Sequence, residues 1–80
     1  PDFVVEIISE SNAYRDLVQK KKLYARFQVK EYWIVIPGEE LIEIYTLKDN
    51  TYTLYKTYTK NDTLASPLIK DLGIELKNIF

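Results

Sequence analysis

The 80-residue sequence contains no cysteine and no histidine. These absences exclude disulfide bonds, zinc sites built from thiolates or imidazoles, cysteine nucleophiles and histidine-based catalytic triads. The only glycines are Gly38 and Gly73, so a glycine-rich loop for binding phosphate is absent as well. No apolar run is long enough to span a membrane and no secretion leader is recognisable, so we expect a cytoplasmic protein. Any catalysis must therefore rely on carboxylates, amines and hydroxyls.

The sequence also lacks methionine and opens on Pro1-Asp2, directly before an apolar segment. We therefore expect the chain to be a fragment, namely the C-terminal part of a single domain, over residues 1–80.

Acidic and basic residues nearly balance, with a net charge of −1, but they are distributed unevenly. Between Tyr14 and Lys30 there are six basic residues and one acidic residue, a local net charge of +5. A basic block on an acidic body is typical of an anion-binding face.

Apolar patterning predicts one main helix and four strands in the order β-α-β-β-β. Residues 3–8 and 32–36 are almost wholly apolar and rich in β-branched side chains, which is typical of strands covered on both faces. A helix is expected between them, over residues 13–28, after a polar break with several helix-capping residues. Residues 41–47 and 51–59 should follow as an antiparallel pair. The two strands that flank the helix should be parallel neighbours, so the fold class is a mixed α/β sheet with the helix packed on it.

The expected helix carries one apolar stripe, formed by Ala13, Leu17, Tyr24 and Phe27. Tyr24, Tyr32 and Trp33 are expected in the core rather than as platforms for stacking bases. Residues 61–73 are expected to form a loop, and residues 76–80 a terminal turn that packs back on the sheet.

Two charged residues interrupt the apolar patterns. Glu6 is the one charge inside the first strand, and Lys20 lies between Leu17 and Tyr24 on the helix stripe. A buried carboxylate is costly unless it is paired or binds a metal. Because the helix directly follows the strand and packs over it, Lys20 and Glu6 can approach each other. Two interpretations stay open: a structural ion pair with a lysine that extends to solvent, or a functional site.

Asp2 lies four residues before Glu6 on the same face of the strand. At about 3.3 Å per residue the two carboxylates are about 13 Å apart and cannot share one metal ion. A co-ligand for Glu6 must therefore come from elsewhere.

Three pieces of the sequence are familiar in combination. They are the strand PDFVVEIIS (residues 1–9), a helix with Arg15-Asp16, Lys20 and LYAR (residues 23–26), and the strand EYWIV (residues 31–35). Together they resemble the Uma-type family, a bacterial family classed as restriction endonucleases.

The resemblance implies a restriction-endonuclease-like fold of the PD-(D/E)xK superfamily. In that superfamily two carboxylates bind Mg²⁺ (or Mn²⁺), and a lysine orients or activates the water that attacks the DNA phosphodiester. Glu6 matches the acidic residue of the motif, and the carbonyl of Ile7 would complete the metal shell. Ile8 stands at the motif's lysine position, so the lysine role falls to Lys20. The family's first catalytic aspartate lies upstream of Pro1, and we therefore expect little or no nuclease activity from this chain alone.

Three hypotheses follow. The first is a metal-dependent DNA endonuclease that uses Glu6, Lys20 and an aspartate outside this chain, acting as a homodimer or higher homo-oligomer. The second is a non-catalytic remnant that oligomerises through an open sheet edge. The third is a small binding domain whose basic helix contacts an acidic partner through Lys21 and Lys22, independently of Glu6.

Overall fold

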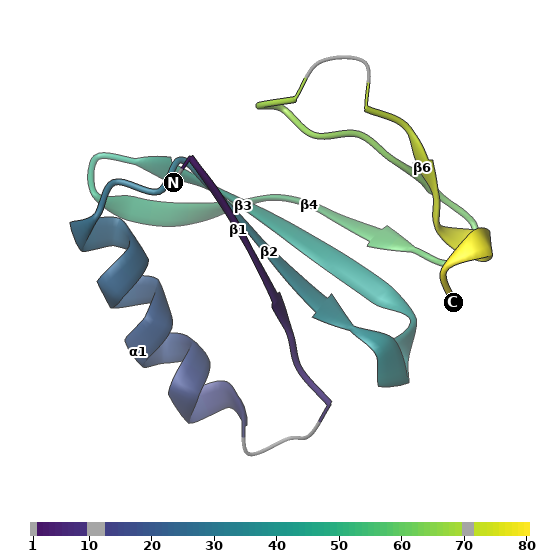
Figure 1. Cartoon of the computed structure of the whole chain (residues 1–80), viewed down its shortest axis with the longest axis horizontal. Coiled ribbons are helices and arrows are strands. Elements are labelled where there is room, and N and C mark those ends of the chain that lie inside the picture. Colours follow the sequence, from purple (N-terminus) through teal and green to yellow (C-terminus); the bar gives the residue numbers. More distant parts are fainter. Residues whose placement is uncertain (1, 10–12, 70–71) are drawn as a thin grey trace.

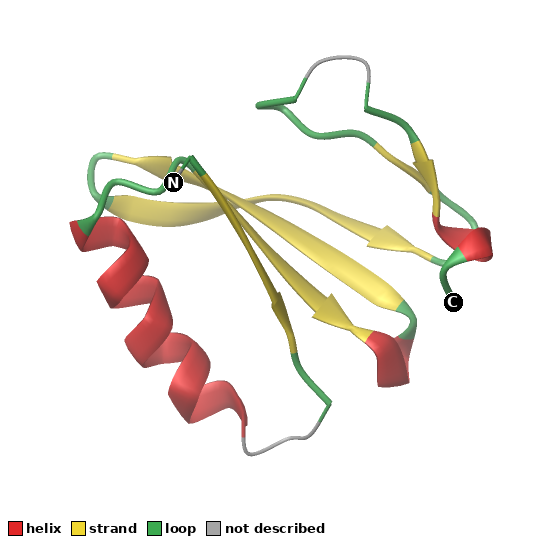
Figure 2. Ribbon diagram, in the orientation of Figure 1, coloured by secondary structure: helices red, strands yellow, loops and turns green. Residues whose placement is uncertain are grey.

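The structure, a computed structural model, describes residues 2–9, 13–69 and 72–80, with only the backbone described for residues 13–15. The capping residues expected at 10–12 and the side chains of Ala13 and Arg15 lie outside this part. The elements in chain order are β1 (Phe3–Ile7), α1 (Ala13–Arg26), β2 (Glu31–Ile36), η1 (Pro37–Glu39), β3 (Leu41–Lys48), β4 (Thr51–Thr59), β5 (Thr63–Leu64), β6 (Ile74–Glu75) and η2 (Leu76–Asn78). The predicted order β-α-β-β-β is confirmed (Figures 1 and 2).

The main sheet has four strands in the order β1-β2-β3-β4. β1 and β2 are parallel, with Glu6 opposite Ile34, and β3 and β4 are antiparallel, both as predicted. β2 and β3 also pair, in antiparallel orientation. Asp49 and Asn50 connect β3 to β4 with φ angles of 52° and 64°. Two-residue hairpin turns need such left-handed residues, and Asp and Asn tolerate this conformation well.

The sheet carries a separate apolar core on each face. The face toward α1 buries Ile8, Leu17, Tyr32 and Ile34. The opposite face buries Trp33, Ile42, Ile44, Tyr58, Leu64 and Leu76. This second core is covered by the C-terminal segment, in which β5 pairs with β6. β5 lies inside the stretch 61–73 that was expected to be a loop, and β6 directly follows it. Figure 1 shows α1 on one side of the sheet and β6 on the other.

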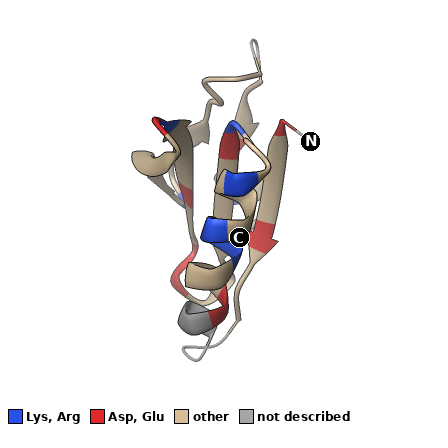
Figure 3. Cartoon of the chain, turned by 90° about the vertical axis from the view of Figure 1, so that its left-hand side faces the viewer, with Lys and Arg blue, Asp and Glu red and all other residues tan. Residues whose placement is uncertain are grey.

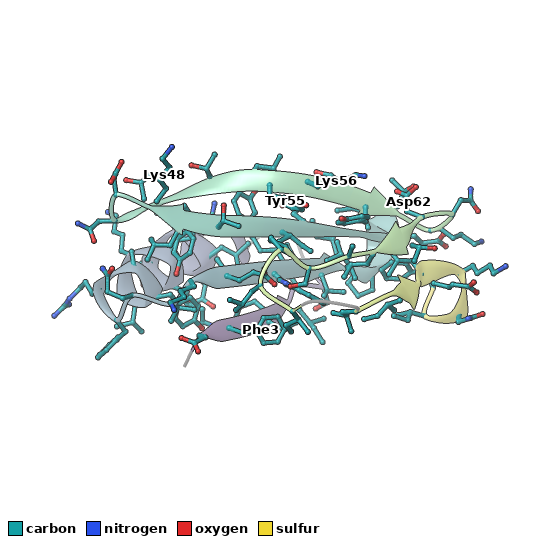
Figure 4. All side chains as sticks on the ribbon, turned by 90° about the horizontal axis from the view of Figure 1, so that it is seen from above. Phe3, Lys48, Tyr55, Lys56 and Asp62 are labelled. Atoms are coloured by element: carbon teal, nitrogen blue, oxygen red, sulfur yellow. The ribbon has the colours of Figure 1, made fainter. Side chains whose placement is uncertain are left out.

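A bulge in β4 allows one strand to serve both cores. Ile44 pairs with Lys56 and Tyr45 with Leu54, so Tyr55 has no partner across the ladder. Alternation alone would place Tyr52 and Tyr58 on the same face, because they are an even number of residues apart. The extra residue reverses the alternation, and Tyr52 therefore packs toward α1 while Tyr58 packs on the other face. Figure 4 labels Tyr55 and Lys56 at this point of β4, with Phe3 of β1 across the sheet.

α1 ends two residues earlier than predicted, because Gln28 adopts a left-handed conformation with φ 57°. The backbone N–H of Gln28 donates to the Ala25 carbonyl, and that of Val29 donates to the Tyr24 carbonyl at 3.0 Å. These two bonds form a Schellman motif, which satisfies carbonyls at the helix end. The prediction that Phe27 belongs to the buried stripe is wrong: it follows the last helical residue, and 69% of it is exposed.

β1 is less covered than its apolar sequence predicts. It lies at the edge of the sheet, where β2 is its one neighbour among the described strands. Val5 and Ile7, which point away from α1, are 42% and 68% exposed. The prediction that β1 is covered on both faces is therefore wrong, whereas β2, which has neighbours on both sides, buries Tyr32, Trp33 and Ile34 as expected.

A buried carboxylate ties the C-terminal segment to the main sheet. Glu31, at the start of β2, is 1% exposed. Its carboxylate accepts hydrogen bonds from Trp33 Nε1 at 2.6 Å, the Ser66 hydroxyl at 2.6 Å and the Leu68 backbone N–H at 3.1 Å. Three donors compensate for the desolvation of one carboxylate, which is the condition under which a buried charge is tolerated.

Candidate functional site

Glu6 lies on the face of β1 that is turned toward α1. Strand alternation places it on the same face as Ile8, which packs in the core beneath the helix. Its side chain is 19% exposed, so the carboxylate is shielded from most solvent without being sealed from it. β1 is an edge strand, so Glu6 lies beside an edge of the sheet that no described strand covers.

Lys20 and Tyr24 of α1 hold the two oxygens of the Glu6 carboxylate. Lys20 Nζ lies 3.1 Å from Glu6 Oε2, and the Tyr24 hydroxyl donates a short hydrogen bond to Glu6 Oε1. The two helix residues are four apart and therefore on the same face of α1. The structure thus brings together Glu6 and Lys20, as their pattern in the sequence suggested, and Lys20 reaches Glu6 from the helix stripe.

Lys20 also forms an ion pair with Asp16, one turn earlier in α1, at 3.2 Å. Its hydrogen bond to Glu6, followed by that to Asp16, raises the pKa of the Lys20 amine above its ordinary value. The ammonium form therefore persists at neutral pH, and the site presents a fixed positive charge between two carboxylates. Figure 3 shows the basic residues along the ribbon of α1 and acidic residues on the strands beside it.

Tyr24 is the member of the site that the sequence argument missed, because it was counted only as a core aromatic. Burial, and then the hydrogen bond to Glu6, raise the pKa of its phenol. Its ring packs edge-on against Tyr32, with centroids 5.3 Å apart. The spacing of four residues between Lys20 and Tyr24 was the available signal, since both residues had been placed on the stripe that faces β1.

Tyr32 lies beneath the site and is fully buried. Its hydroxyl has no hydrogen-bond partner among the described residues. Burial, with a contribution from the negative charge of Glu6, raises its pKa well above the ordinary value. Glu6 therefore contacts Lys20 and Tyr24 directly, and its charge also acts on the unpaired Tyr32 hydroxyl.

The described residues do not by themselves fit a complete divalent metal site. No group of three or more acidic side chains that could share a metal occurs among them. Asp2 is exposed and its Oδ1 lies 4.0 Å from Lys30 Nζ, and its separation from Glu6 stays a prediction. Glu6 is the one carboxylate at the site on β1, and both of its oxygens are engaged by α1. Ile7 ends β1 beside it, and a metal-binding role for its carbonyl stays a prediction.

Comparison with known proteins gives one family. The family model Uma2, described as "Putative restriction endonuclease", matches residues 1–77. A search of curated proteins finds no match. Within the part of the chain that the structure describes, no helix is long and apolar enough to cross a membrane.

Proposed function

Since the chain belongs to the Uma2 family, we propose that it acts in an endonuclease that hydrolyses phosphodiester bonds of DNA, with Glu6 and Lys20 as catalytic residues. The observation that carries the proposal is the contact of Lys20 with Glu6 at 3.1 Å on the open edge of the sheet. An ion pair that only stabilises the fold could lie anywhere on the protein surface. This pair lies at the edge strand of the sheet, in a chain that matches a family described as restriction endonucleases.

The chemistry assigned to the pair follows from its charges. Hydrolysis requires a water molecule to attack phosphorus while the ester oxygen leaves, and negative charge grows on the phosphate oxygens. The Glu6 carboxylate is suited to orient that water as a hydrogen-bond acceptor, and the Lys20 ammonium to offset the growing charge. The family implies Mg²⁺ or Mn²⁺, for which Glu6 and the Ile7 carbonyl would be ligands. The family's second metal-binding carboxylate is needed in addition, and we expect it from outside the described residues.

The test is cleavage of plasmid DNA in Mg²⁺ and in Mn²⁺. We expect the 80-residue chain alone to cut weakly or not at all, because Glu6 is the one family metal-binding carboxylate that we assign to it. Where the gene encodes residues before Pro1, the longer product should cut. Glu6→Gln and Lys20→Met should each lower its rate by about 10²-fold or more.

Glu75 and Lys77 provide matched controls, since they form an exposed ion pair at 3.9 Å at the other end of the molecule. Glu75→Gln and Lys77→Met should leave the cleavage rate unchanged. A longer product that neither binds nor cuts DNA would refute the proposed function. Robust Mg²⁺-dependent cutting by the 80-residue chain, abolished by Glu6→Ala, would refute the need for a second carboxylate from outside these residues and leave the endonuclease function standing.

A second candidate, a small domain that self-associates, is favoured by the exposure of Val5 and Ile7 on the edge strand. An open edge with apolar side chains is a template for strand pairing with a second copy. Sedimentation of the wild-type chain and of Ile7→Lys, combined with the cleavage assay, separates the two candidates. Self-association that Ile7→Lys removes, in a protein without nuclease activity at any length, would favour this candidate. A monomer at all concentrations would exclude it.

A further inference from the structure

The face of α1 turned away from Glu6 forms a groove with the β3–β4 turn. Two adjoining hollows, of about 340 Å³ and about 430 Å³, share Lys22, Ala25 and Asn50 as lining residues and therefore form one continuous groove. We name it the α1–turn groove, and its residues in the argument are Lys21, Lys22, Ala25, Arg26, Gln28 and Asn50. Ala25 provides its floor, because a methyl side chain leaves space between the longer basic side chains on either side.

The groove presents cations and hydrogen-bond donors. Lys21, Lys22 and Arg26 line it, and no acidic residue is among the described residues that do, although Asp49 is the chain neighbour of Asn50. The Gln28 amide nitrogen donates to Asn50 Oδ1 at 2.7 Å. Since the Asn50 oxygen accepts this bond, its amide NH₂ group remains available as a donor beside the basic side chains. This set of groups is complementary to an anion.

The groove is separate from the candidate active site. Successive residues of an α-helix are rotated by about 100°, so Lys20 and Lys22 point to opposite sides of α1. Lys20 contacts Glu6, and Lys21 lies over the Tyr45 ring at 3.9 Å from its centroid, on the side of β3. Lys22 and Arg26 are exposed and enter no ion pair among the described residues. Their charges are therefore available for an external ligand.

We infer that the α1–turn groove binds phosphates of the DNA backbone, with Lys22 and Arg26 as the principal contacts and Asn50 as an additional donor. The inference rests on the proposed endonuclease function for the identity of the ligand. Lys22 and Arg26 are one turn apart, about 6 Å along the helix axis, which corresponds to about two nucleotides of one strand of a duplex. An acidic polypeptide would also be attracted to these cations. Its backbone N–H groups, however, would have no carboxylate in this groove to accept their hydrogen bonds.

Because the groove lies across α1 from Glu6, it would hold DNA beside the site of cleavage and not the scissile phosphate itself. Phosphate contacts of this kind fix the position of the protein on the duplex and carry no sequence information. Loss of the contacts should therefore weaken binding to all sequences alike and reduce its dependence on salt.

The experiment measures binding of the chain to a fluorescent DNA duplex over a range of salt concentrations, with EDTA present to separate binding from cleavage. In Lys22→Ala/Arg26→Ala, affinity should fall and the slope of log K against log salt should become shallower by about 1.8, about 0.9 per cation removed. Alanine favours the helix, and circular dichroism would verify that α1 is retained. Lys22→Gln/Arg26→Gln provides a second variant that retains polar side chains of similar reach.

The matched control is Lys60→Ala/Lys77→Ala, which also removes two positive charges, from ion pairs with Glu40 and Glu75 away from the groove. Its salt slope should equal that of the wild type. Equal slopes for both double variants and the wild type would overturn the inference, as would binding of polyglutamate but not of the duplex through Lys22 and Arg26. Groove-dependent binding of DNA in a protein that never cuts it would refute the nuclease function alone. DNA binding and cleavage that are unchanged by the substitutions of Lys22 and Arg26 would refute the binding role of the groove alone.

Discussion

Tyr24 donates its hydroxyl hydrogen to one oxygen of the Glu6 carboxylate, and thereby joins the middle of α1 to the edge strand of the sheet. The other oxygen of Glu6 is held by Lys20. A carboxylate with both oxygens engaged has a fixed orientation, since rotation about its last bond would break two contacts at once. The pair therefore has a structural consequence that can be measured apart from any catalysis.

We expect Tyr24→Phe to lower the free energy of unfolding by about 1 kcal/mol, because it removes one hydrogen bond to a charged group that is only partly shielded from solvent. Urea denaturation measures the change. Tyr55→Phe is the matched control, because Tyr55 is half exposed and has no partner among the described residues. Its effect should remain within about 0.5 kcal/mol. An equal effect of the two substitutions would mean that the Tyr24–Glu6 bond contributes nothing.

Tyr→Phe substitutions at two other positions should change the stability of the fold in different ways. The Tyr52 hydroxyl donates to the Val29 carbonyl at 2.6 Å, whereas the buried Tyr32 hydroxyl has no partner among the described residues. Tyr52→Phe should therefore destabilise by about 1 kcal/mol, and Tyr32→Phe should be neutral or stabilising. Thermal unfolding of both variants measures the contrast. A Tyr32→Phe variant that loses as much stability as Tyr52→Phe would show that the Tyr32 hydroxyl is hydrogen-bonded in solution.

The Glu31 carboxylate should be the most sensitive polar position of the fold. Glu31→Ala leaves the Trp33 Nε1 donor buried without an acceptor and releases Ser66, so we expect a loss of about 2–4 kcal/mol in the free energy of unfolding. Ser66→Ala should cost about 1 kcal/mol. The exposed Glu39→Ala is the control and should be silent. Equal stabilities of the Glu31 and Glu39 variants would contradict the anchoring role of Glu31.

Stability should decline at alkaline pH. The pKa of the Lys20 amine is raised by its hydrogen bonds to Glu6 and Asp16, and the pKa values of the Tyr32 and Tyr52 phenols are raised by burial. The folded protein therefore holds these protons more tightly than the unfolded chain. The stabilisation is fully present below about pH 10 and is lost as the pH rises through the folded-state pKa values.

Urea unfolding measured between neutral pH and about pH 11 checks this expectation, together with a titration of tyrosinate by ultraviolet absorbance. Some of the seven tyrosines should ionise only at a pH well above 10 or on unfolding. A flat stability profile with all tyrosines ionising together near pH 10 would contradict the raised pKa values.

Local patterns predicted the order and type of the main elements, because hydrophobic periodicity and turn residues act over short stretches of chain. The parallel pairing of β1 with β2 and the antiparallel pairing of β3 with β4 follow from such patterns. Phe27 was assigned wrongly because Gln28 adopts a left-handed conformation that ends the helix. Glycine and asparagine favour this conformation, whereas a glutamine does not indicate it. The exposure of Val5 and Ile7 was missed because an apolar strand does not reveal whether it lies at an edge or in the centre of a sheet.

The candidate site was predictable in part for the same reason. Glu6 and Lys20 interrupt apolar patterns, so each was visible as an exception. Tyr24 was not visible in this way, since a tyrosine on an apolar stripe fits the pattern whether or not its hydroxyl forms a hydrogen bond in the site. Glu31 escaped notice because its donors Ser66 and Leu68 are more than thirty residues away in the chain. The bulge at Tyr55 depends on the partner strand and has no local signal.

The position of β1 at the sheet edge links the candidate site to local unfolding. One ladder, to β2, and the contacts with α1 hold this strand in place, so β1 can detach in a fluctuation smaller than global unfolding. Each such event separates Glu6 from Lys20 and Tyr24. The protection of β1 amides against hydrogen exchange, compared with that of β3 amides in the centre of the sheet, therefore reports the free energy that keeps the site assembled.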